Sequence, residues 1–324
     1  MSQTTETLHL RTVIDNHTQD LTGRVAAVTG TTSGTGFVCA RELARLGAQV
    51  ILINRASERA VAALARLQQA VPEGRFVSIT GDLQDFASVR SAAEQIRESH
   101  DRIDILCNNA GVMALPDQAT RDGYDVQIQT NCISHFLLTR ELFPLLLASD
   151  DGRIVNHTSA ARRGPPLEEK YFGKNGGNLG GDGTPEENAS FGGPRWQRYH
   201  QTKLANCNFT YALQEKMAAK GITNVKALLA HPGLARTQLQ VTTASVGGMA
   251  ADSSFMNAAQ SAEDGATGII RACADPAAAS GSFYGPTGWT GFPELLPPED
   301  NLKDAENLRI NWEGCEAAVG AFEI

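Results

Sequence analysis

The sequence of 324 residues has no apolar run near the ~18 residues that a membrane-spanning helix needs. Its first 20 residues are polar and lack the basic, apolar and small-residue blocks of a secretory signal. Closely spaced cysteine pairs such as C-x-x-C are also absent, and several of the six cysteines fall within apolar runs. We therefore expect no membrane span, no export and a reducing cytoplasmic location.

An excess of basic charge is missing as well. The chain has 28 Lys and Arg against 36 Asp and Glu, a formal net charge of −8, with no block of like charges. This balance disfavours nucleic acid or an anionic membrane surface as a partner. The histidines His157, His200 and His231 form no local metal-ligand spacing, and no G-x-S-x-G elbow of a hydrolase occurs. A small-molecule partner and no metal are expected.

Short apolar runs alternate with segments of helical periodicity along most of the chain. The expected strands are 24–29, 49–54, 75–80, 103–107, 153–157, 225–230 and 281–285. The expected helices between them include 57–70, 85–99, 124–147 and 261–274. Such alternation predicts an α/β fold, a single Rossmann-type doubly wound parallel sheet with helices on both faces. We divide the chain into a polar extension (1–20), a catalytic domain (21–290) with an insertion (164–195) and a substrate lid (238–260), and a C-terminal extension with a helix (291–324).

A glycine turn follows the first expected strand. Gly30, Gly34 and Gly36, with Ser33 and Thr35 between them, lead into a helix at 37–46. Between a strand and a helix, such glycines let the backbone approach a pyrophosphate while the helix N-terminus presents free N–H groups to it. A strand–turn–helix unit of this kind predicts a dinucleotide site.

The second expected strand ends at Asn54-Arg55, where such folds meet the adenosine ribose. An acid at this point would bind a 2′-hydroxyl, whereas a guanidinium suits a 2′-phosphate. NADP is therefore the expected cofactor, with NAD as the alternative. Arg55 could also simply end a strand in solvent.

Tyr199 and Lys203 stand four residues apart at the start of a helical run, on the same helix face. Lowering a tyrosine pKa from about 10 to about 7 requires roughly 4 kcal/mol. One positive charge at ~4 Å supplies about that much at an effective dielectric of about 20. The pair could serve as a general acid and base, although this spacing also occurs by chance on solvated helices.

Four ordered motifs together resemble the classical short-chain dehydrogenase/reductase family, over roughly residues 20 to 290. They are T-G-x-x-x-G-x-G from Thr29, Asp82-Leu83, N-N-A-G at 108–111, and Y-x-x-x-K from Tyr199. The resemblance implies that Asp82 and Leu83 contact the adenine and that Asn109, Ala110 and Gly111 line the cofactor ribose. It also places Pro232, Gly233 and Thr237 beside the nicotinamide. Thr35 departs from the family's usual isoleucine or leucine, which affects packing beneath the loop.

The same resemblance implies roles in an NADP(H)-dependent interconversion of a carbonyl and an alcohol. Tyr199 would exchange the proton, Ser159 would hydrogen-bond the substrate oxygen, Lys203 would lower the Tyr199 pKa and hold the ribose, and Asn131 would hold a water in the proton relay. Two alternatives stay open: a silent NADP-sensing protein, and a reductase of C=C bonds, light-dependent or otherwise. Light-dependent members carry a cysteine where this chain has Leu234.

Between Ser159 and Tyr199 the chain is longer than in small family members. The stretch 164–195 is rich in glycine and proline, which predicts a loop. It and the C-terminal helix resemble the retinol dehydrogenase and protochlorophyllide reductase branch, in which the insertion lies over the helix that tetrameric members use for assembly. We therefore expect a monomer or weak homodimer that acts on a medium-sized, partly apolar carbonyl or alcohol.

Overall fold

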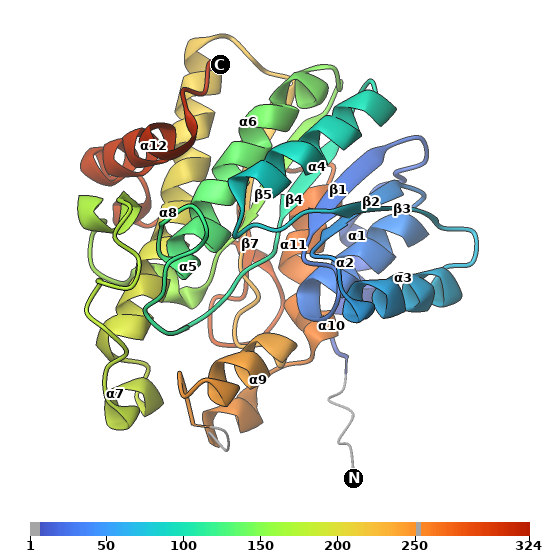
Figure 1. Cartoon of the computed structure of the whole chain (residues 1–324). Helices are drawn as coiled ribbons and strands as arrows, with labels where there is room; N and C mark the ends of the chain where they lie inside the picture. Colours follow the sequence, from blue (N-terminus) through green and yellow to red (C-terminus); the bar gives the residue numbers. More distant parts are fainter. Residues whose placement is uncertain (1–6, 251–253) are drawn as a thin grey trace.

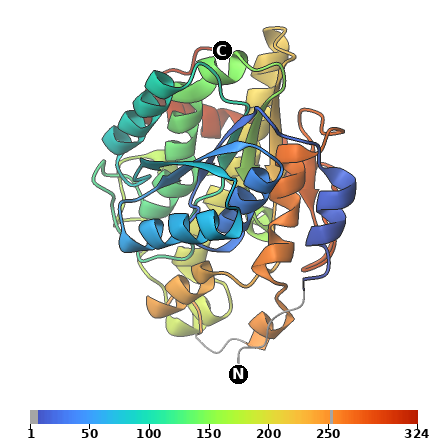
Figure 2. The same ribbon diagram turned by 90° about the vertical axis from the view of Figure 1, so that its right-hand side faces the viewer.

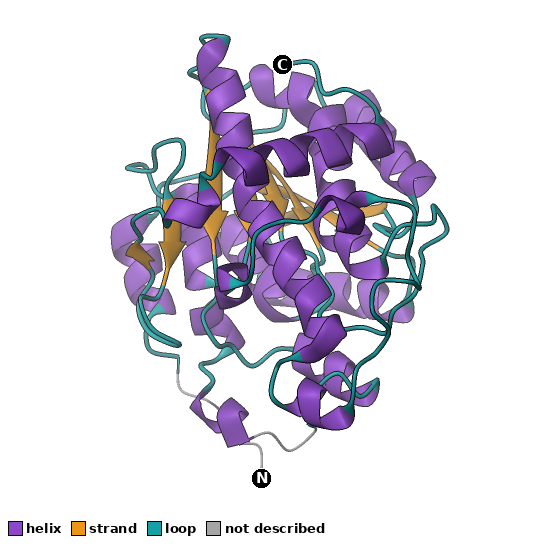
Figure 3. Cartoon of the chain, turned by 90° about the vertical axis from the view of Figure 1, so that its left-hand side faces the viewer, coloured by secondary structure: helices purple, strands orange, loops and turns teal. Residues whose placement is uncertain are grey.

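An eight-stranded sheet forms the centre of the protein, and helices cover both of its faces (Figures 1 and 3). The computed structural model describes residues 7–250 and 254–324. The strand order is β3-β2-β1-β4-β5-β6-β7-β8. Neighbouring strands are parallel from β3 to β7, and β8 is antiparallel to β7. The strands are β1 (Val25–Thr29), β2 (Gln49–Asn54), β3 (Arg75–Thr80), β4 (Ile105–Asn108), β5 (Gly152–His157), β6 (Val225–Ala230), β7 (Phe283–Gly285) and β8 (Glu294–Leu295).

The helices form two layers, each with its own apolar core. One layer contains α1 (Leu10–His17), α2 (Gly34–Arg45), α3 (Glu58–Ala70) and α11 (Thr267–Ala274). The other contains α4 (Phe86–Ser99), α6 (Ser134–Leu147), α8 (Gly193–Ala219) and α12 (Ala305–Val319). Figure 2 shows α1 lying beside α11 at the outside of the first layer. The predicted doubly wound α/β fold is confirmed. Among the strands that the structure describes, the short edge strand β8 is the one that the sequence did not predict.

Local sequence signals set the ends of these helices. Ser57 accepts a hydrogen bond from the Ala60 amide at the start of α3, and Asp85 does the same for the first amides of α4. Gly47, with φ +98°, follows the end of α2 in the left-handed conformation that favours glycine. These caps explain why the predicted boundaries of α3 and α4 agree with the structure within one residue.

Some expected elements differ in detail. The helix predicted at 261–274 is two pieces, α10 (Ala262–Gly265) and α11. The run predicted at 124–147 consists of α5 (Val126–Ile128), a π turn (Gln129–Ile133) and α6. The extension at 1–20 contains α1. Residues 1–6 of that extension and 251–253 of the predicted lid lie outside the described residues. Within the described part, no helix has the length and apolarity to cross a membrane.

The remaining elements are short and lie just before or within the insertion, in the lid, or in the C-terminal extension. They are the 3₁₀ turns Ala160–Arg163, Glu169–Phe172, Ser254–Ala258 and Asp300–Leu302, with the helices α7 (Pro185–Ala189) and α9 (Gln238–Ser245). The insertion therefore has no long regular element, as its composition predicts.

Buried charges fasten the insertion to the body. Asp117 accepts hydrogen bonds from the insertion's backbone amides at 177, 179 and 181. Arg198, fully buried on α8, donates to the carbonyls of Leu179 and Gly181 and lies 3.4 Å from Asp125. Since buried backbone groups need partners, these bonds let an irregular segment pack closely against α8.

Candidate active site

A cavity of about 930 Å³ lies at the carboxyl ends of the parallel strands. β1 and β4 are neighbours in the sheet, and their connections leave toward opposite faces, which opens a crevice between them. The cavity lining includes the glycine turn after β1, the segments after β4 and β5, and the start of α8. It thus brings together the regions in which the sequence placed the site residues.

The glycine turn lies so close to its neighbours that side chains would not fit. A Cβ on Gly30, whose φ is +72°, would come within 2.8 Å of the Ala110 backbone. A Cβ on Gly36 would overlap Asn109 Nδ2 and the Gly30 carbonyl. Ser33, the N-cap of α2, makes no side-chain capping bond within the described residues, so the first N–H groups of α2 keep their capacity to bind an anion. The turn therefore fits a dinucleotide pyrophosphate.

Two arginines lie at the adenosine end of the cavity. Arg55 and Arg59 both line it and are exposed, and Arg59 Nη2 lies 3.4 Å from Ser33 Oγ. Asn54 instead holds the glycine turn, because its Oδ1 accepts from the Thr31 amide at 2.8 Å. Arg59 was missed from the sequence, since its place beside the turn depends on the packing of α3.

The predicted adenine and ribose contacts line the same cavity. Asp82 caps its own turn by accepting from the Gln84 amide, and the Leu83 carbonyl accepts from Ser134. Side-chain bonds of this kind fix the turn after β3 at the cavity wall. The lining residues here are Asp82, Leu83, Asn109, Ala110 and Gly111.

Asn109 connects the glycine turn to β5. Its Nδ2 donates to the carbonyls of Thr29 and Gly30. Its Oδ1 accepts from Thr35 Oγ1 and from His157 Nδ1, each at 3.0 Å. Thr35, the residue that departs from the family pattern, therefore has a specific hydrogen-bond partner. Because Asn109 Oδ1 can only accept, the proton of neutral His157 lies on Nδ1.

Tyr199, Ser159 and Lys203 meet at the other end of the cavity. Burial raises the pKa of Tyr199 to about 12, and a hydrogen bond with Ser159 opposes this effect. Burial lowers the pKa of Lys203 to about 8. Lys203 Nζ donates to the His157 carbonyl at 3.0 Å. The expected lowering of the Tyr199 pKa by Lys203 is therefore not found in this structure, in which burial dominates and the ammonium lies 5.8 Å from the centre of the Tyr199 ring.

Asn131 lies in the π turn before α6. Its side chain bonds both backbone groups of Val112 at 2.8 Å and donates to Thr202 Oγ1 at 3.0 Å. A Cβ on Gly111 would lie 3.2 Å from Asn131 Oδ1 and 3.7 Å from Lys203 Nζ. The absence of a side chain on Gly111 therefore leaves room between the amide and the ammonium, where the expected relay requires it.

The residues predicted to lie beside the nicotinamide also line the cavity. Thr237 caps α9, and Gly233 has a φ of +59°. A Cβ on Gly34 would come within 3.2 Å of Thr237 Cβ, so a glycine is needed for Thr237 to approach the turn. Pro232 completes this part of the lining.

The three histidines fit supporting roles. Burial lowers the pKa of both His157 and His231 to about 3, which keeps the rings neutral. His200 Nδ1 lies 2.8 Å from the Ala161 carbonyl. Among the residues that the structure describes, none of these histidines belongs to a cluster with metal-ligand geometry.

Aromatic and methionine side chains form a wall of the cavity next to Tyr199. Trp196 packs edge-on against Tyr199 and against Phe191, with centroid distances of 5.8 and 4.9 Å. The ring of Phe255 packs against both Phe191 and Trp289. The wall also includes Met113, Met249 and Met256. These residues come from distant segments, and no local motif marks them.

The fold is a Rossmann-type sheet with its main cavity at the carboxyl ends of the parallel strands. A family model described as short chain dehydrogenase matches residues 24–171. Retinol dehydrogenase 14 of Mus musculus is 31% identical over 318 residues, which cover 93% of this chain and 87% of that protein. The chain therefore belongs to the short-chain dehydrogenase family.

Two further relatives bear on the branch and the fold. An uncharacterized oxidoreductase of Schizosaccharomyces pombe is 37% identical over 69% of this chain, a match that spans 64% of that relative's length. A crystal structure of an uncharacterized protein from Mycobacterium paratuberculosis superposes with a TM-score of 0.74 at 30% identity, covering 96% of this chain and 98% of that one. The expected resemblance to the retinol dehydrogenase branch is confirmed by these comparisons.

Replacing Gly36 by alanine tests the fit of the glycine turn. The new Cβ would overlap Asn109 and the Gly30 carbonyl, so the turn must shift. We expect the NADPH dissociation constant, measured by fluorescence titration, to rise at least about tenfold, or roughly 1.4 kcal/mol. Gly173→Ala is the matched control, since a Cβ there would meet nothing nearer than 3.7 Å among the described residues. Unchanged NADPH affinity in Gly36→Ala would contradict the fit.

Proposed function

We propose that this protein is an NADP(H)-dependent oxidoreductase that interconverts a carbonyl and a primary or secondary alcohol. The observation that carries the proposal is the shared cavity: a glycine turn fitted to a dinucleotide at one end, and Tyr199, Ser159 and Lys203 at the other. When bound, the nicotinamide would supply the hydride. The protein would supply orientation, exclusion of water and the proton.

Tyr199 would give the proton to the carbonyl oxygen. Its pKa of about 12 keeps the phenol protonated at neutral pH, which suits a donor in the reductive direction. Ser159, already hydrogen-bonded to Tyr199, would hold the same oxygen. Lys203 and Asn131 lie on either side of the space above Gly111, where a water could return the proton from solvent.

The walls next to Tyr199 support an apolar substrate. Among the described residues, the charged side chains of the cavity lining are Arg55, Arg59, Asp82 and Lys203. The first three belong to the adenosine end, and the fourth belongs to the catalytic group. Since an uncompensated charge is costly in an apolar pocket, the substrate half would favour an uncharged, largely hydrophobic carbonyl or alcohol. The names of the retinol dehydrogenase relatives, which point to an apolar alcohol, agree with this substrate class.

Substitution of Tyr199 by phenylalanine tests the chemistry. We expect turnover of a carbonyl panel with NADPH to fall at least about 10²-fold, because a positioned general acid contributes that much or more. NADPH affinity should change little. Tyr211→Phe is the matched control, since Tyr211 is buried on the same helix and its hydroxyl has no partner in the described part of the chain. Turnover in Tyr199→Phe equal to that of an active Tyr211→Phe would refute the role of Tyr199. No turnover by the wild type on the whole panel, with NADPH still bound, would instead favour the silent binding protein.

The choice of NADP over NAD rests on Arg55 and Arg59. Solved members of this fold include a short chain dehydrogenase from Escherichia coli complexed with NADPH, which supports a nicotinamide cofactor. Removing a charge-assisted bond to a 2′-phosphate should raise the KM for NADPH by about tenfold to 100-fold in Arg55→Ala, and less in Arg59→Ala. The KM for NADH should stay constant. Arg75→Ala is the control, because Arg75 lies at the amino end of β3 and the cavity lies at the carboxyl ends of the strands. An equal rise in KM for NADPH and NADH would argue against the assignment.

We also propose that the protein is a monomer or a weak homodimer, and the packing of α12 supports this proposal. α12 and the 3₁₀ turn at Glu169–Phe172 lie against each other, and α12 packs on α8. In Figure 1 α12, in red, covers the outside of α8 and α6. Trp312 of α12 packs against Phe136, Phe209 and Phe322, which removes apolar surface that helix-to-helix assembly would need. We expect the mass of one chain by size exclusion with light scattering, and a stable tetramer would overturn this part of the proposal.

A further inference from the structure

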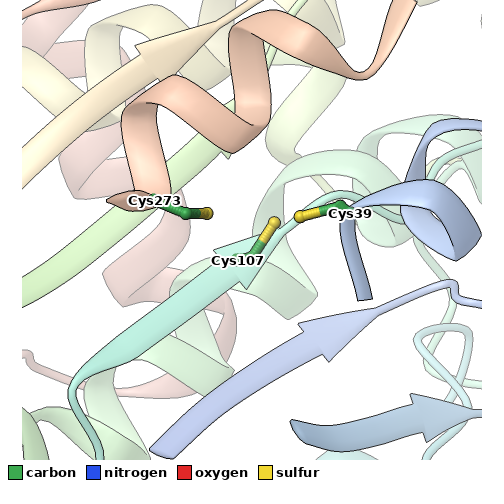
Figure 4. Close-up of side chains that lie close together, drawn as sticks. All are labelled: Cys39, Cys107 and Cys273. Atoms are coloured by element: carbon green, nitrogen blue, oxygen red, sulfur yellow. The ribbon is translucent and has the colours of Figure 1, made fainter. Parts of the chain in front are cut away.

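Three cysteines from distant parts of the chain meet inside the protein. Cys39 lies on α2, Cys107 on β4 and Cys273 in the last turn of α11. Their Sγ atoms all lie within 4.8 Å of one another, and Figure 4 shows the three side chains converging. Neither the predicted dinucleotide site nor the catalytic group uses them.

The thiols are fully buried in the apolar core on the α2 side of the sheet. All three are reduced. Burial raises the pKa of Cys107, so its sulfur carries its proton at neutral pH. The charge of Arg153 acts on Cys273. The Arg153 guanidinium is itself hydrogen-bonded to the Asp151 carboxylate at 2.7 Å and to the Asp275 carbonyl at 2.9 Å. Glu42, whose charge acts on Cys39, is likewise paired with Arg41 and Arg45. The charges that act on the cluster are therefore already paired with groups outside it.

The number of ligands limits which ions the cluster could hold. Structural zinc is almost always bound by four protein ligands in a tetrahedron. Within residues 7–250 and 254–324, no fourth His, Cys, Asp or Glu ligand atom joins the three sulfurs. When three sulfurs bind one ion with bonds of about 2.3 Å, the sulfurs lie about 4 Å apart or less. The Sγ atoms here lie within 4.8 Å of one another, so small side-chain rotations would bring them to that separation. The site fits an ion that takes three sulfur ligands.

Charge then selects among the ions that accept three sulfurs. Three thiolates around Cu(I) leave a net charge of −2, and around Zn(II) a net charge of −1. A net charge in an apolar, buried site costs several kcal/mol or more. Three thiolates around a trivalent ion leave no net charge. Arsenic in its trivalent state is thiophilic and takes three sulfur ligands in a pyramid, so its complex here would be neutral.

We propose that Cys39, Cys107 and Cys273 form a binding site for a trivalent thiophilic ion, with arsenite as its probe. Arsenous acid carries three hydroxyl groups. Each combines with a thiol proton and leaves as water, so three As–O and three S–H bonds break while three As–S bonds and three O–H bonds form. Neither arsenic nor sulfur changes oxidation state. Because the thiols are buried, entry requires local opening between α2 and α11, and binding will be slow.

The test measures arsenic bound by the reduced full chain. We expect native mass spectrometry to show one arsenic atom gained and three hydrogens lost, after long incubation with arsenite or after refolding in its presence. X-ray absorption at the arsenic edge should show three sulfur neighbours in the wild-type protein. Single alanine or valine variants of Cys39, Cys107 and Cys273 should each weaken binding at least about tenfold.

The chain supplies its own controls. Cys132 and Cys315 form a buried pair with sulfurs 3.9 Å apart, and Cys207 stands apart from both groups. A pair can offer only two sulfurs, so arsenic held there would keep an oxygen neighbour. Alanine variants of these three cysteines should bind arsenic like the wild type. Three outcomes would each overturn the proposal. They are loss of binding in Cys132→Ala, an oxygen neighbour of arsenic in the wild-type spectrum, and no arsenic bound after either long incubation or refolding with arsenite.

Discussion

The side-chain amide of Asn109 is the interaction on which the arrangement of the cavity depends. β1 and β4 diverge at this point, and nothing in the sheet ladder itself would hold the turns that follow them together. Asn109 bonds the end of β1 through two carbonyls, α2 through Thr35 and the end of β5 through His157. One amide thus links the proposed cofactor turn to the strand that leads to Ser159. The contact requires glycine at position 36, because any Cβ there would displace the amide.

Burial, more than pairwise charge, sets the pKa values of the two proposed catalytic groups, Tyr199 and Lys203. The structure keeps the Tyr199 phenol protonated and brings the pKa of Lys203 down to about 8, both through loss of solvent. A direct contact between ammonium and phenol is not needed for Tyr199 to act as a donor. The Lys203 ammonium instead bonds the His157 carbonyl, next to the Asn109 network. The position of Lys203 is therefore coupled to the same amide that holds the glycine turn.

The sequence predicted the features that short segments encode. The glycine turn, the strands and the spacing of Tyr199 and Lys203 are local patterns, so the fold class and the grouping of these residues could be inferred without coordinates. The pKa of Tyr199 could not be inferred from the sequence, because desolvation depends on the whole packed environment. The aromatic wall and the cysteine cluster each join residues from distant segments. The hydrogen-bond partner of Thr35 was also hidden, since it lies on another strand connection.

The walls of the substrate half are attached to the catalytic helix itself. Trp196 lies three residues before Tyr199 on α8 and donates from Nε1 to the Gly248 carbonyl at 2.9 Å. Thr243, near the end of α9, donates to the Met113 carbonyl on the facing wall. Arg195 adds a bond to the Val246 carbonyl. The segment after α9 therefore cannot move away without breaking contacts to the turn of α8 that positions Tyr199. A movement of this wall would therefore also disturb the orientation of the phenol, because the same helical turn contacts the wall and carries Tyr199.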